Sequence, residues 1–266
     1  MAETALITGA TGGLGRAIAE DLAKRGVCLV LTARDEGKLR EMAQELEAKY
    51  RIETDIFSEN LCDLNAPVRL WERLKEQGAT VDILVNNAGF GDFGDYLDAN
   101  WERQEEMIQV NILALMRLTR LFAPEMAKRR HGRILNVSSM AGFAPGPHLS
   151  VYYASKAFVL SFSQALHEEM RAMGVSVTAL CPGPTKTGFE KAAGLQGESK
   201  LFQVFPNAPA SRVAACGVKA LYAGKAIVIP GVANKLLAFV TRMAPRSLMR
   251  RVVGSFQRAV RSSSVS

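Results

Sequence analysis

TALITGATGGLGRAIAEDLAKR, residues 4–25, contains an apolar run, a glycine-rich segment and an amphipathic stretch, in that order. Its apolar run Ala5–Thr8 predicts a β-strand, and the spacing of apolar residues over Gly13–Arg25 predicts an amphipathic helix. The glycines between the two permit a tight turn and a close approach of another group to the backbone. Since free N–H groups at the start of a helix bind phosphate, the stretch predicts a site for the pyrophosphate of a dinucleotide.

The glycine spacing by itself leaves an alternative open. Gly9, Gly13 and Gly15 follow the pattern G-x-x-x-G-x-G, which differs from the commoner dinucleotide-binding pattern G-x-G-x-x-G. The same residues could form an ordinary turn followed by a helix cap. The organisation of the rest of the chain therefore has to decide between the two.

The rest of the chain alternates between short apolar runs and longer amphipathic stretches. The runs predicted as strands are 5–8, 27–32, 52–57, 82–86, 133–138, 176–181 and 226–229. The stretches predicted as helices are 13–25, 36–49, 66–77, 101–129, 152–173 and 209–223, with Pro124 expected to kink or end the fourth. Such alternation is typical of an α/β fold, in which right-handed crossovers produce a parallel sheet with helices on both faces.

We expect a single doubly wound, Rossmann-like domain of about seven strands over residues 1–231, followed by a helical extension over 232–266. The extension would contain helices over 234–243, with Asn234 as N-cap, and over 247–256. Residues 201–266 hold ten basic and no acidic residues, whereas residues 1–200 hold 23 basic and 26 acidic residues. The net charge of +7 therefore arises in the C-terminal quarter.

Several classes of protein are not indicated. The N-terminal residues lack the basic start and long apolar run of a secretory signal, and no segment offers about 20 uninterrupted apolar residues. The cysteines lie far apart without metal-binding spacing, so we expect reduced thiols in a cytoplasmic protein without a metal site. No nucleic-acid-binding module is visible, and the basic residues of the extension are interleaved with apolar ones, so no nucleic-acid partner is expected.

The end of the second predicted strand bears on the choice of cofactor. NAD-binding proteins usually carry an acidic residue there, which accepts hydrogen bonds from the ribose hydroxyls. Ala33 occupies that position here and Arg34 follows, whose guanidinium could hold the 2′-phosphate of NADPH. Asp35 could be the acid if the register shifts by two, and both charged residues could instead simply open the next helix. The sequence favours NADPH.

A tyrosine and a lysine share one face of a predicted helix. Tyr152 and Lys156 are four residues apart, so their side chains can converge on one site. Ser139 ends the fifth predicted strand, at the sheet edge where parallel sheets bind ligands. Tyr153 and Ser138 are the neighbours that a shift of register would substitute, and helix geometry alone leaves them open.

With these residues in this order, the chain resembles the short-chain dehydrogenase/reductase family. The resemblance extends from Ala5 to about Thr187. The matching residues are Thr8, Gly9, Gly13, Gly15, Asp63, Asn86, Asn87, Ala88, Gly89, Asn111, Ser139, Tyr152, Lys156, Pro182 and Gly183.

The resemblance implies a role for each member of the catalytic set. Tyr152 would be the general acid in carbonyl reduction and the base in alcohol oxidation. The Lys156 ammonium would favour the phenolate and bind the nicotinamide ribose. Ser139 would help to polarise the substrate carbonyl, and Asn111 would hold a water of a proton relay.

The resemblance, together with Arg34, also gives an expected cofactor site, in which Asp63 would meet the adenine amino group. The expected set is Thr8, Gly9, Thr11, Gly12, Gly13, Leu14, Gly15, Arg34, Asp63, Leu64, Asn87, Ala88, Gly89, Tyr152, Lys156, Pro182, Gly183, Thr185 and Thr187.

Two further regions have expected partners. The resemblance implies a substrate lid at about 188–210 and a homo-oligomer, a dimer or a tetramer. The apolar lid candidates, which could equally pack on the core, are Phe189, Leu195, Leu201, Phe202, Val204 and Phe205. The apolar residues of 232–266 need a covering, which could be the parent domain, a second subunit or an anionic membrane surface.

The sequence thus predicts an NADPH-dependent oxidoreductase that reduces an apolar aldehyde, ketone or 3-oxoacyl substrate, or oxidises the matching alcohol. One alternative is an NAD-dependent alcohol dehydrogenase with the same site, and another is a low-turnover NADPH-binding sensor or scaffold. The combination of Ser139, Tyr152 and Lys156 argues against the sensor, which has no need of a proton donor beside the nicotinamide.

Overall fold

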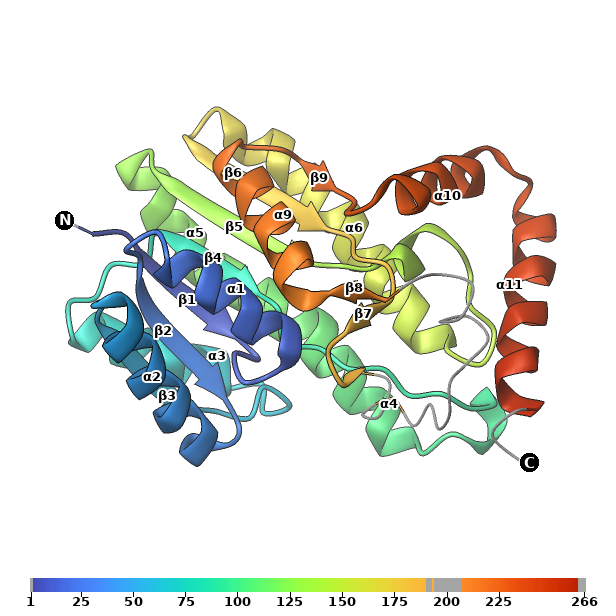
Figure 1. Cartoon of the computed structure of the whole chain (residues 1–266), viewed down its shortest axis with the longest axis horizontal. Helices are drawn as coiled ribbons and strands as arrows, with labels where there is room; N and C mark the ends of the chain where they lie inside the picture. The colour runs from blue at the N-terminus through green and yellow to red at the C-terminus, as the bar shows by residue number, and fades with distance from the viewer. Residues whose placement is uncertain (1, 190–192, 194–206, 263–266) are drawn as a thin grey trace.

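Parallel strands in the order β3-β2-β1-β4-β5-β6-β9 form one sheet in the computed structural model, which describes residues 2–189, 193 and 207–262 (Figure 1). The strands are β1 (Thr4–Thr8), β2 (Cys28–Ala33), β3 (Thr54–Ser58), β4 (Ile83–Asn86), β5 (Gly132–Val137), β6 (Val175–Leu180) and β9 (Ile227–Val228). Each neighbouring pair is parallel. The predicted doubly wound sheet of about seven strands is therefore confirmed.

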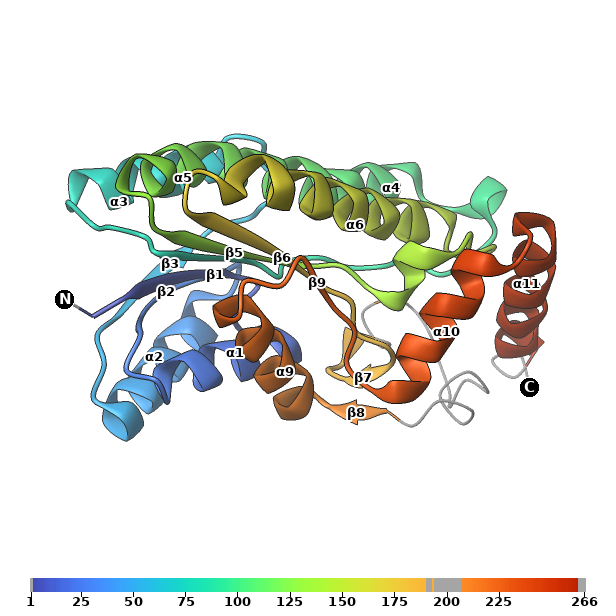
Figure 2. The same cartoon turned by 90° about the horizontal axis from the view of Figure 1, so that it is seen from above.

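Helices cover both faces of the sheet (Figure 2). One face carries α1 (Gly13–Ala23), α2 (Glu36–Tyr50) and α9 (Ala210–Tyr222). The other carries α3 (Ala66–Glu76), α4 (Trp101–Ile108), α5 (Leu115–Arg129) and α6 (Ser150–Arg171). Because successive strand residues point to opposite faces, the apolar run of β1 serves both cores. Ile7 belongs to the core with Ile18 of α1, and Leu6 to the core with Phe122 of α5.

The order of the strands places the ligand-binding edge. The chain runs outward from β1 through β2 to β3, then returns to β4 on the other side of β1. The loops that follow β1 and β4 diverge at this reversal, and in open α/β sheets ligands bind in the crevice so formed.

The fourth predicted helix is interrupted by a wider turn. Residues Gln109–Ala114 between α4 and α5 form a π-helix, a local widening that often marks functional sites. Pro124 lies inside α5, so of the two expected effects, a kink or an end of the helix, the second does not occur. Its neighbours Ala123 and Met126 are buried in the core, and this packing holds the helix together around the missing N–H group.

A short strand pair was not predicted. β7 (Thr185–Lys186) pairs in parallel with β8 (Ala208–Pro209), and α9 begins only after Pro209. Strands of two residues carry no readable periodicity. Most of the expected lid, including Leu195, Leu201, Phe202, Val204 and Phe205, lies outside the described residues.

The C-terminal extension consists of α10 (Val232–Met243) and α11 (Arg246–Ser262), which follow β9 beyond the carboxyl edge of the sheet (Figure 1). Helix α10 begins before Asn234, so the assignment of Asn234 as N-cap is wrong. The residue that precedes the helix is Gly231, with φ of 90°, a value that favours glycine. The Asn234 amide instead donates to the Pro230 carbonyl at 2.7 Å.

Within the described ranges, no helix is long and apolar enough to cross a bilayer. The four cysteines, Cys28, Cys62, Cys181 and Cys216, are unpaired, and Cys181 is the buried one.

Candidate active site

A cavity of about 760 Å³ lies along the carboxyl edge of the sheet, at the reversal between β1 and β4. The glycine loop forms its centre, Arg34 lies toward one end, and Ser139 and Tyr152 lie toward the other. Its volume falls within the range of about 300–1,000 Å³ that is common for small-molecule sites.

The glycine loop is packed too closely for side chains. A Cβ on Gly15 would lie 2.3 Å from the Gly9 carbonyl oxygen, and one on Gly13 would lie 2.7 Å from the Thr187 Cα. Gly9 also has φ of 62°, in the left-handed region. Helix α1 begins at this loop without a side-chain cap and without an acidic residue in its first turn. The N–H groups there suit an anion, and the loop fits a pyrophosphate.

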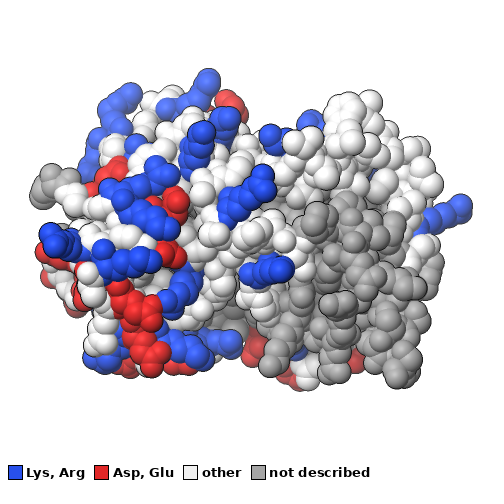
Figure 3. Space-filling model, in the orientation of Figure 1, with Lys and Arg blue, Asp and Glu red and all other residues white. Residues whose placement is uncertain are grey.

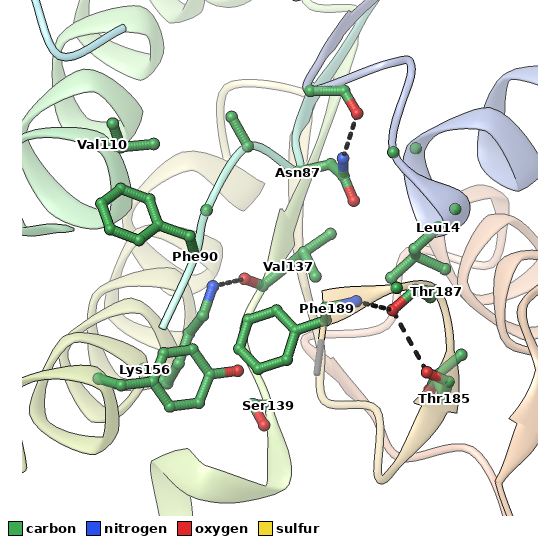
Figure 4. A pocket seen from close by; sticks show the side chains of 18 of the residues that line it. Leu14, Asn87, Phe90, Val110, Val137, Ser139, Lys156, Thr185, Thr187 and Phe189 are labelled. Carbon is green, nitrogen blue, oxygen red and sulfur yellow. Dashed lines mark hydrogen bonds between the residues drawn. The ribbon is translucent and has the colours of Figure 1, made fainter. Parts of the chain in front are cut away.

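Asn87 ties the glycine loop to the end of β4. Its amide donates to the carbonyls of Thr8 at 2.9 Å and Gly9 at 3.1 Å, as Figure 4 shows in part. The Thr8 hydroxyl in turn accepts from the backbone N–H groups of Asn87 and Ala88. Thr8 does not line the cavity, so its position supports the loop rather than a direct cofactor contact.

At the adenosine end, the structure places Arg34 on the cavity wall with its side chain exposed. Asp35 also lines the cavity but is the N-cap of α2. One of its carboxylate oxygens accepts from the Lys38 N–H at 3.1 Å, and the other pairs with the Lys38 ammonium at 2.8 Å. These contacts hold the pKa of Asp35 below its usual value. The reading of Asp35 as a helix-opening residue therefore has a structural basis.

Asp63 and Leu64 are not brought to the cavity, which corrects their predicted placement. The Asp63 carboxylate pairs with Arg69 at 2.6 Å and caps the Asn65 N–H at 2.9 Å. The wall after β3 is formed by Glu59, Asn60, Leu61 and Cys62 instead.

The structure brings Ser139, Tyr152 and Lys156 together at the opposite end. The Lys156 ammonium donates to the Val137 carbonyl at 2.9 Å (Figure 4) and lies 5.8 Å from the centroid of the Tyr152 ring. Tyr152 and Ser139 line the same end of the cavity, and the Ser139 side chain acts to lower the pKa of Tyr152. A phenol, a hydroxyl and an ammonium therefore converge from β5 and α6.

Burial shifts both ionisable groups of this cluster toward their neutral forms. Desolvation raises the pKa of Tyr152 to about 12, although the Ser139 side chain acts to lower it. Desolvation also lowers the pKa of Lys156 to about 8. At neutral pH Tyr152 therefore holds its proton and can act as an acid, and Lys156 is largely charged.

The neighbouring serine and tyrosine have other contacts. Ser138 is buried and donates to the Lys156 carbonyl at 2.8 Å, which ties β5 to α6. The Tyr153 hydroxyl accepts from the Gln257 amide of α11 at 3.0 Å. Neither contact suits proton transfer, and the geometry favours Ser139 and Tyr152.

Asn111 lies in the π-helical turn, buried behind the cavity wall. Its amide oxygen accepts from the Phe90 N–H at 3.1 Å, and its amide nitrogen donates to the Phe90 carbonyl and to the Ser155 hydroxyl, both at 3.0 Å. A Cβ on Gly89 would lie 2.9 Å from the Asn111 amide oxygen and 3.2 Å from the Lys156 ammonium. Glycine therefore keeps Asn111 and Lys156 close, while the proton relay stays a prediction.

The segment after β6 closes the cavity beside the catalytic cluster. The Thr187 hydroxyl donates to the Thr185 carbonyl at 3.3 Å and accepts from the Phe189 N–H at 3.4 Å (Figure 4). The Phe189 ring lies 5.2 Å from the Tyr152 ring, centroid to centroid. Pro182, Gly183, Thr185 and Thr187 all line the cavity, and their contact with the nicotinamide end of a cofactor stays a prediction.

The lining residues that were not predicted include Lys38, Phe90, Met140 and Gln257. Lys38 and Phe90 directly follow predicted motifs, and that proximity was a usable signal. Gln257 comes from α11, more than a hundred residues from its partner Tyr153, and no local pattern indicates it.

Comparison with known proteins agrees with this geometry. The family model described as short chain dehydrogenase matches residues 3–197. The very-long-chain 3-oxoacyl-CoA reductase of Mus musculus is 30% identical over 271 residues, which covers 98% of this chain and 82% of that protein. Alignments with other vertebrate reductases of that name cover 56–61% of those proteins, so the chain spans about three fifths of their length.

Solved structures are similar over most of the chain. A short-chain dehydrogenase from Sphingobium yanoikuyae in complex with NADPH has a TM-score of 0.81 and 31% identity, covering 89% of this chain and 92% of that one. A short-chain dehydrogenase/reductase from Burkholderia phymatum in complex with NAD has a TM-score of 0.80 and 27% identity, covering 90% and 92%. The neighbours therefore support a nicotinamide cofactor and leave the choice between NAD and NADP open.

We predict that Tyr152→Phe abolishes most turnover of a carbonyl substrate and retains cofactor binding. Removing a positioned general acid costs about 10²–10⁴-fold in rate. The measurement is kcat by loss of reduced-cofactor absorbance, with cofactor affinity from fluorescence titration. Tyr153→Phe is the matched control and should keep most of the rate; the reverse ranking of the two variants would overturn the assignment.

We also predict that kcat/KM for reduction falls above about pH 8. The lowered pKa of Lys156 means that its cation is present below about pH 8 and is lost above it, whereas Tyr152, with a pKa of about 12, stays protonated. The check is a pH profile from 6 to 10, since kcat/KM reports the groups of the free enzyme. In Lys156→Arg the residual kcat/KM should not fall above about pH 8, because arginine does not deprotonate in this range. If kcat/KM of that variant still falls above about pH 8, the fall belongs to a group other than Lys156.

Proposed function

The chain belongs to the short-chain dehydrogenase family and is an oxidoreductase of carbonyl and alcohol groups, and from that premise we propose that it is an NADPH-dependent reductase of a 3-oxoacyl substrate with a long apolar chain. The observation that carries the proposal is the convergence of Ser139, Tyr152 and Lys156 on a cavity that also contains the glycine loop and Arg34. The proton donor and the residues that would hold the cofactor therefore line the same cavity.

Bound reduced nicotinamide would supply the hydride, and the chain supplies the remaining steps. Ser139 donates a hydrogen bond to the substrate carbonyl and polarises it. The Tyr152 hydroxyl gives its proton to the same oxygen as negative charge develops there. The Lys156 ammonium stabilises the phenolate that remains. In alcohol oxidation the same groups act in the opposite order.

The preference for NADPH rests on the charge at the adenosine end. Arg34 and Lys38 both line the cavity there, and a guanidinium and an ammonium suit a 2′-phosphate dianion. The acid that follows Arg34, Asp35, is already engaged by the backbone and side chain of Lys38. An NAD-dependent enzyme would need that carboxylate free to accept from the ribose hydroxyls.

The preference for an apolar acyl substrate rests on the wall around the catalytic cluster. Phe90, Met140, Leu149, Tyr153 and Phe189 all line this end of the cavity. A substrate chain that contacts these side chains would leave water and gain about 0.8 kcal/mol for each buried methylene. The name of the mouse relative, a very-long-chain 3-oxoacyl-CoA reductase, supports the same class of substrate.

We predict that Arg34→Ala raises KM for NADPH about tenfold or more and leaves KM for NADH nearly unchanged. The lost charge-assisted hydrogen bonds are worth about 1.5–3 kcal/mol, and only NADPH has the phosphate that receives them. Steady-state kinetics with both cofactors measure the effect. Arg40→Ala is the matched control, because Arg40 pairs with Glu36 on α2 and does not line the cavity. Equal losses with the two cofactors would refute the assignment of Arg34.

We further predict that kcat/KM rises with acyl length in a series of 3-oxoacyl thioesters, by up to about fourfold for each methylene that becomes buried. Simple ketones and aldehydes of matched chain length serve as comparison substrates, each run with NADPH and NADH. A flat dependence on length, or a preference for short polar ketones, would contradict an apolar acyl site without affecting the oxidoreductase assignment.

A further inference from the structure

Helix α10 exposes a continuous apolar stripe. Its residues recur at intervals of three and four and therefore share one helix face. The stripe consists of Val232 (82% exposed), Leu236 (64%), Phe239 (63%), Val240 (46%) and Met243 (71%). We call these five residues the α10 stripe.

The opposite side of α10 holds the helix on the domain. Ala238 is buried, and Asn234 packs against Gly183, where an added Cβ would lie 2.6 Å from the Asn234 amide nitrogen. The stripe is therefore not the face that attaches α10 to the rest of the described chain. Exposed apolar side chains that are contiguous, rather than scattered, indicate an interaction surface.

Basic residues accompany the stripe. Lys235 and Arg242 are seven residues apart on α10 and lie along one side of it, and both are exposed. Arg246, Arg250 and Arg251 of α11 are exposed as well. No Asp or Glu occurs from Leu201 to the C-terminus, and in Figure 3 the surface over α10 shows no acidic side chain.

This charge pattern distinguishes between two candidate partners for the α10 stripe, a second copy of the chain and an anionic lipid surface. In a two-fold symmetric pair of chains built on the stripe, each set of basic residues would face its own copy, and like charges oppose such contact. An anionic lipid surface instead attracts each basic residue and accepts the apolar stripe among its acyl chains. We propose that the α10 stripe and its basic residues dock this protein on an anionic lipid bilayer.

The docking surface is connected to the catalytic cavity through α11. Gln257 of this helix is buried, lines the cavity and donates to the Tyr153 hydroxyl beside Tyr152. Asn234 of α10 also packs on Gly183, another lining residue, so a bilayer on α10 would lie beside the catalytic end of the cavity. Docking itself does not depend on which substrate is reduced.

The test is flotation of the full-length protein with vesicles of phosphatidylcholine containing one quarter phosphatidylglycerol, and with vesicles of phosphatidylcholine alone. The wild type should float with the anionic vesicles, and raising the salt should weaken binding because charge attraction is screened. Each basic residue near such a surface strengthens partition about fivefold, so Lys235→Glu with Arg242→Glu should weaken it tenfold or more. Leu236→Ser with Phe239→Ser should do the same.

A matched charge control is Lys128→Glu with Arg171→Glu. These residues lie near the C-terminal ends of α5 and α6, which lead into the amino ends of β5 and β6, whereas α10 follows the carboxyl edge. The control variant should float like the wild type, and all variants should retain cofactor binding as a check of folding.

Wild type that stays unbound, or α10 variants that float as well as the control, would overturn the proposal. So would loss of a dimer on size-exclusion chromatography when the stripe is changed, since that result would make the stripe a contact between two copies. Vesicle binding is measured without turnover, so its failure leaves the proposed reductase function untouched.

Discussion

The ammonium of Lys156 sits in the protein interior with an uncharged carbonyl, that of Val137, as its hydrogen-bond partner. A neutral partner offsets only part of the cost of removing a cation from water, and the pKa of Lys156 falls to about 8 for this reason. The charge is therefore available to stabilise an anion placed beside it. The position of this one cation depends on the relative placement of β5 and α6, which the Ser138 hydrogen bond to the Lys156 carbonyl holds.

Close backbone contacts also fix the positions of the other parts of the site. Gly89 leaves no room for a side chain between Asn111 and Lys156, and Gly15 leaves none between α1 and the Gly9 carbonyl. Asn87 then binds the glycine loop to the end of β4. The loop follows β1 and Ser139 follows β5, two strands of one sheet with β4 between them. The distance between a bound cofactor and the proton donor is therefore set by strand spacing rather than by loop flexibility.

Sequence reasoning succeeded where a residue type has a strict physical reason. The glycine loop needs backbone space, and Tyr152 and Lys156 must share a helix face, so both were visible in the pattern. It failed where position depends on the path of an irregular connection. Asp63 was expected at the adenine end, but the turn after β3 lines the cavity with residues 59–62, and nothing in the local periodicity separates Asp63 from these positions.

The same distinction explains the C-terminal extension. Its apolar and basic spacing was readable, and two helices were predicted with boundaries wrong by a few residues, because amphipathic periodicity is a local property. That Gln257 meets Tyr153 is a property of the folded chain alone. This contact connects the C-terminal extension to the cavity. Through Gln257, helix α11 forms part of the cavity wall, so a shift of this helix would move that side chain relative to Tyr153.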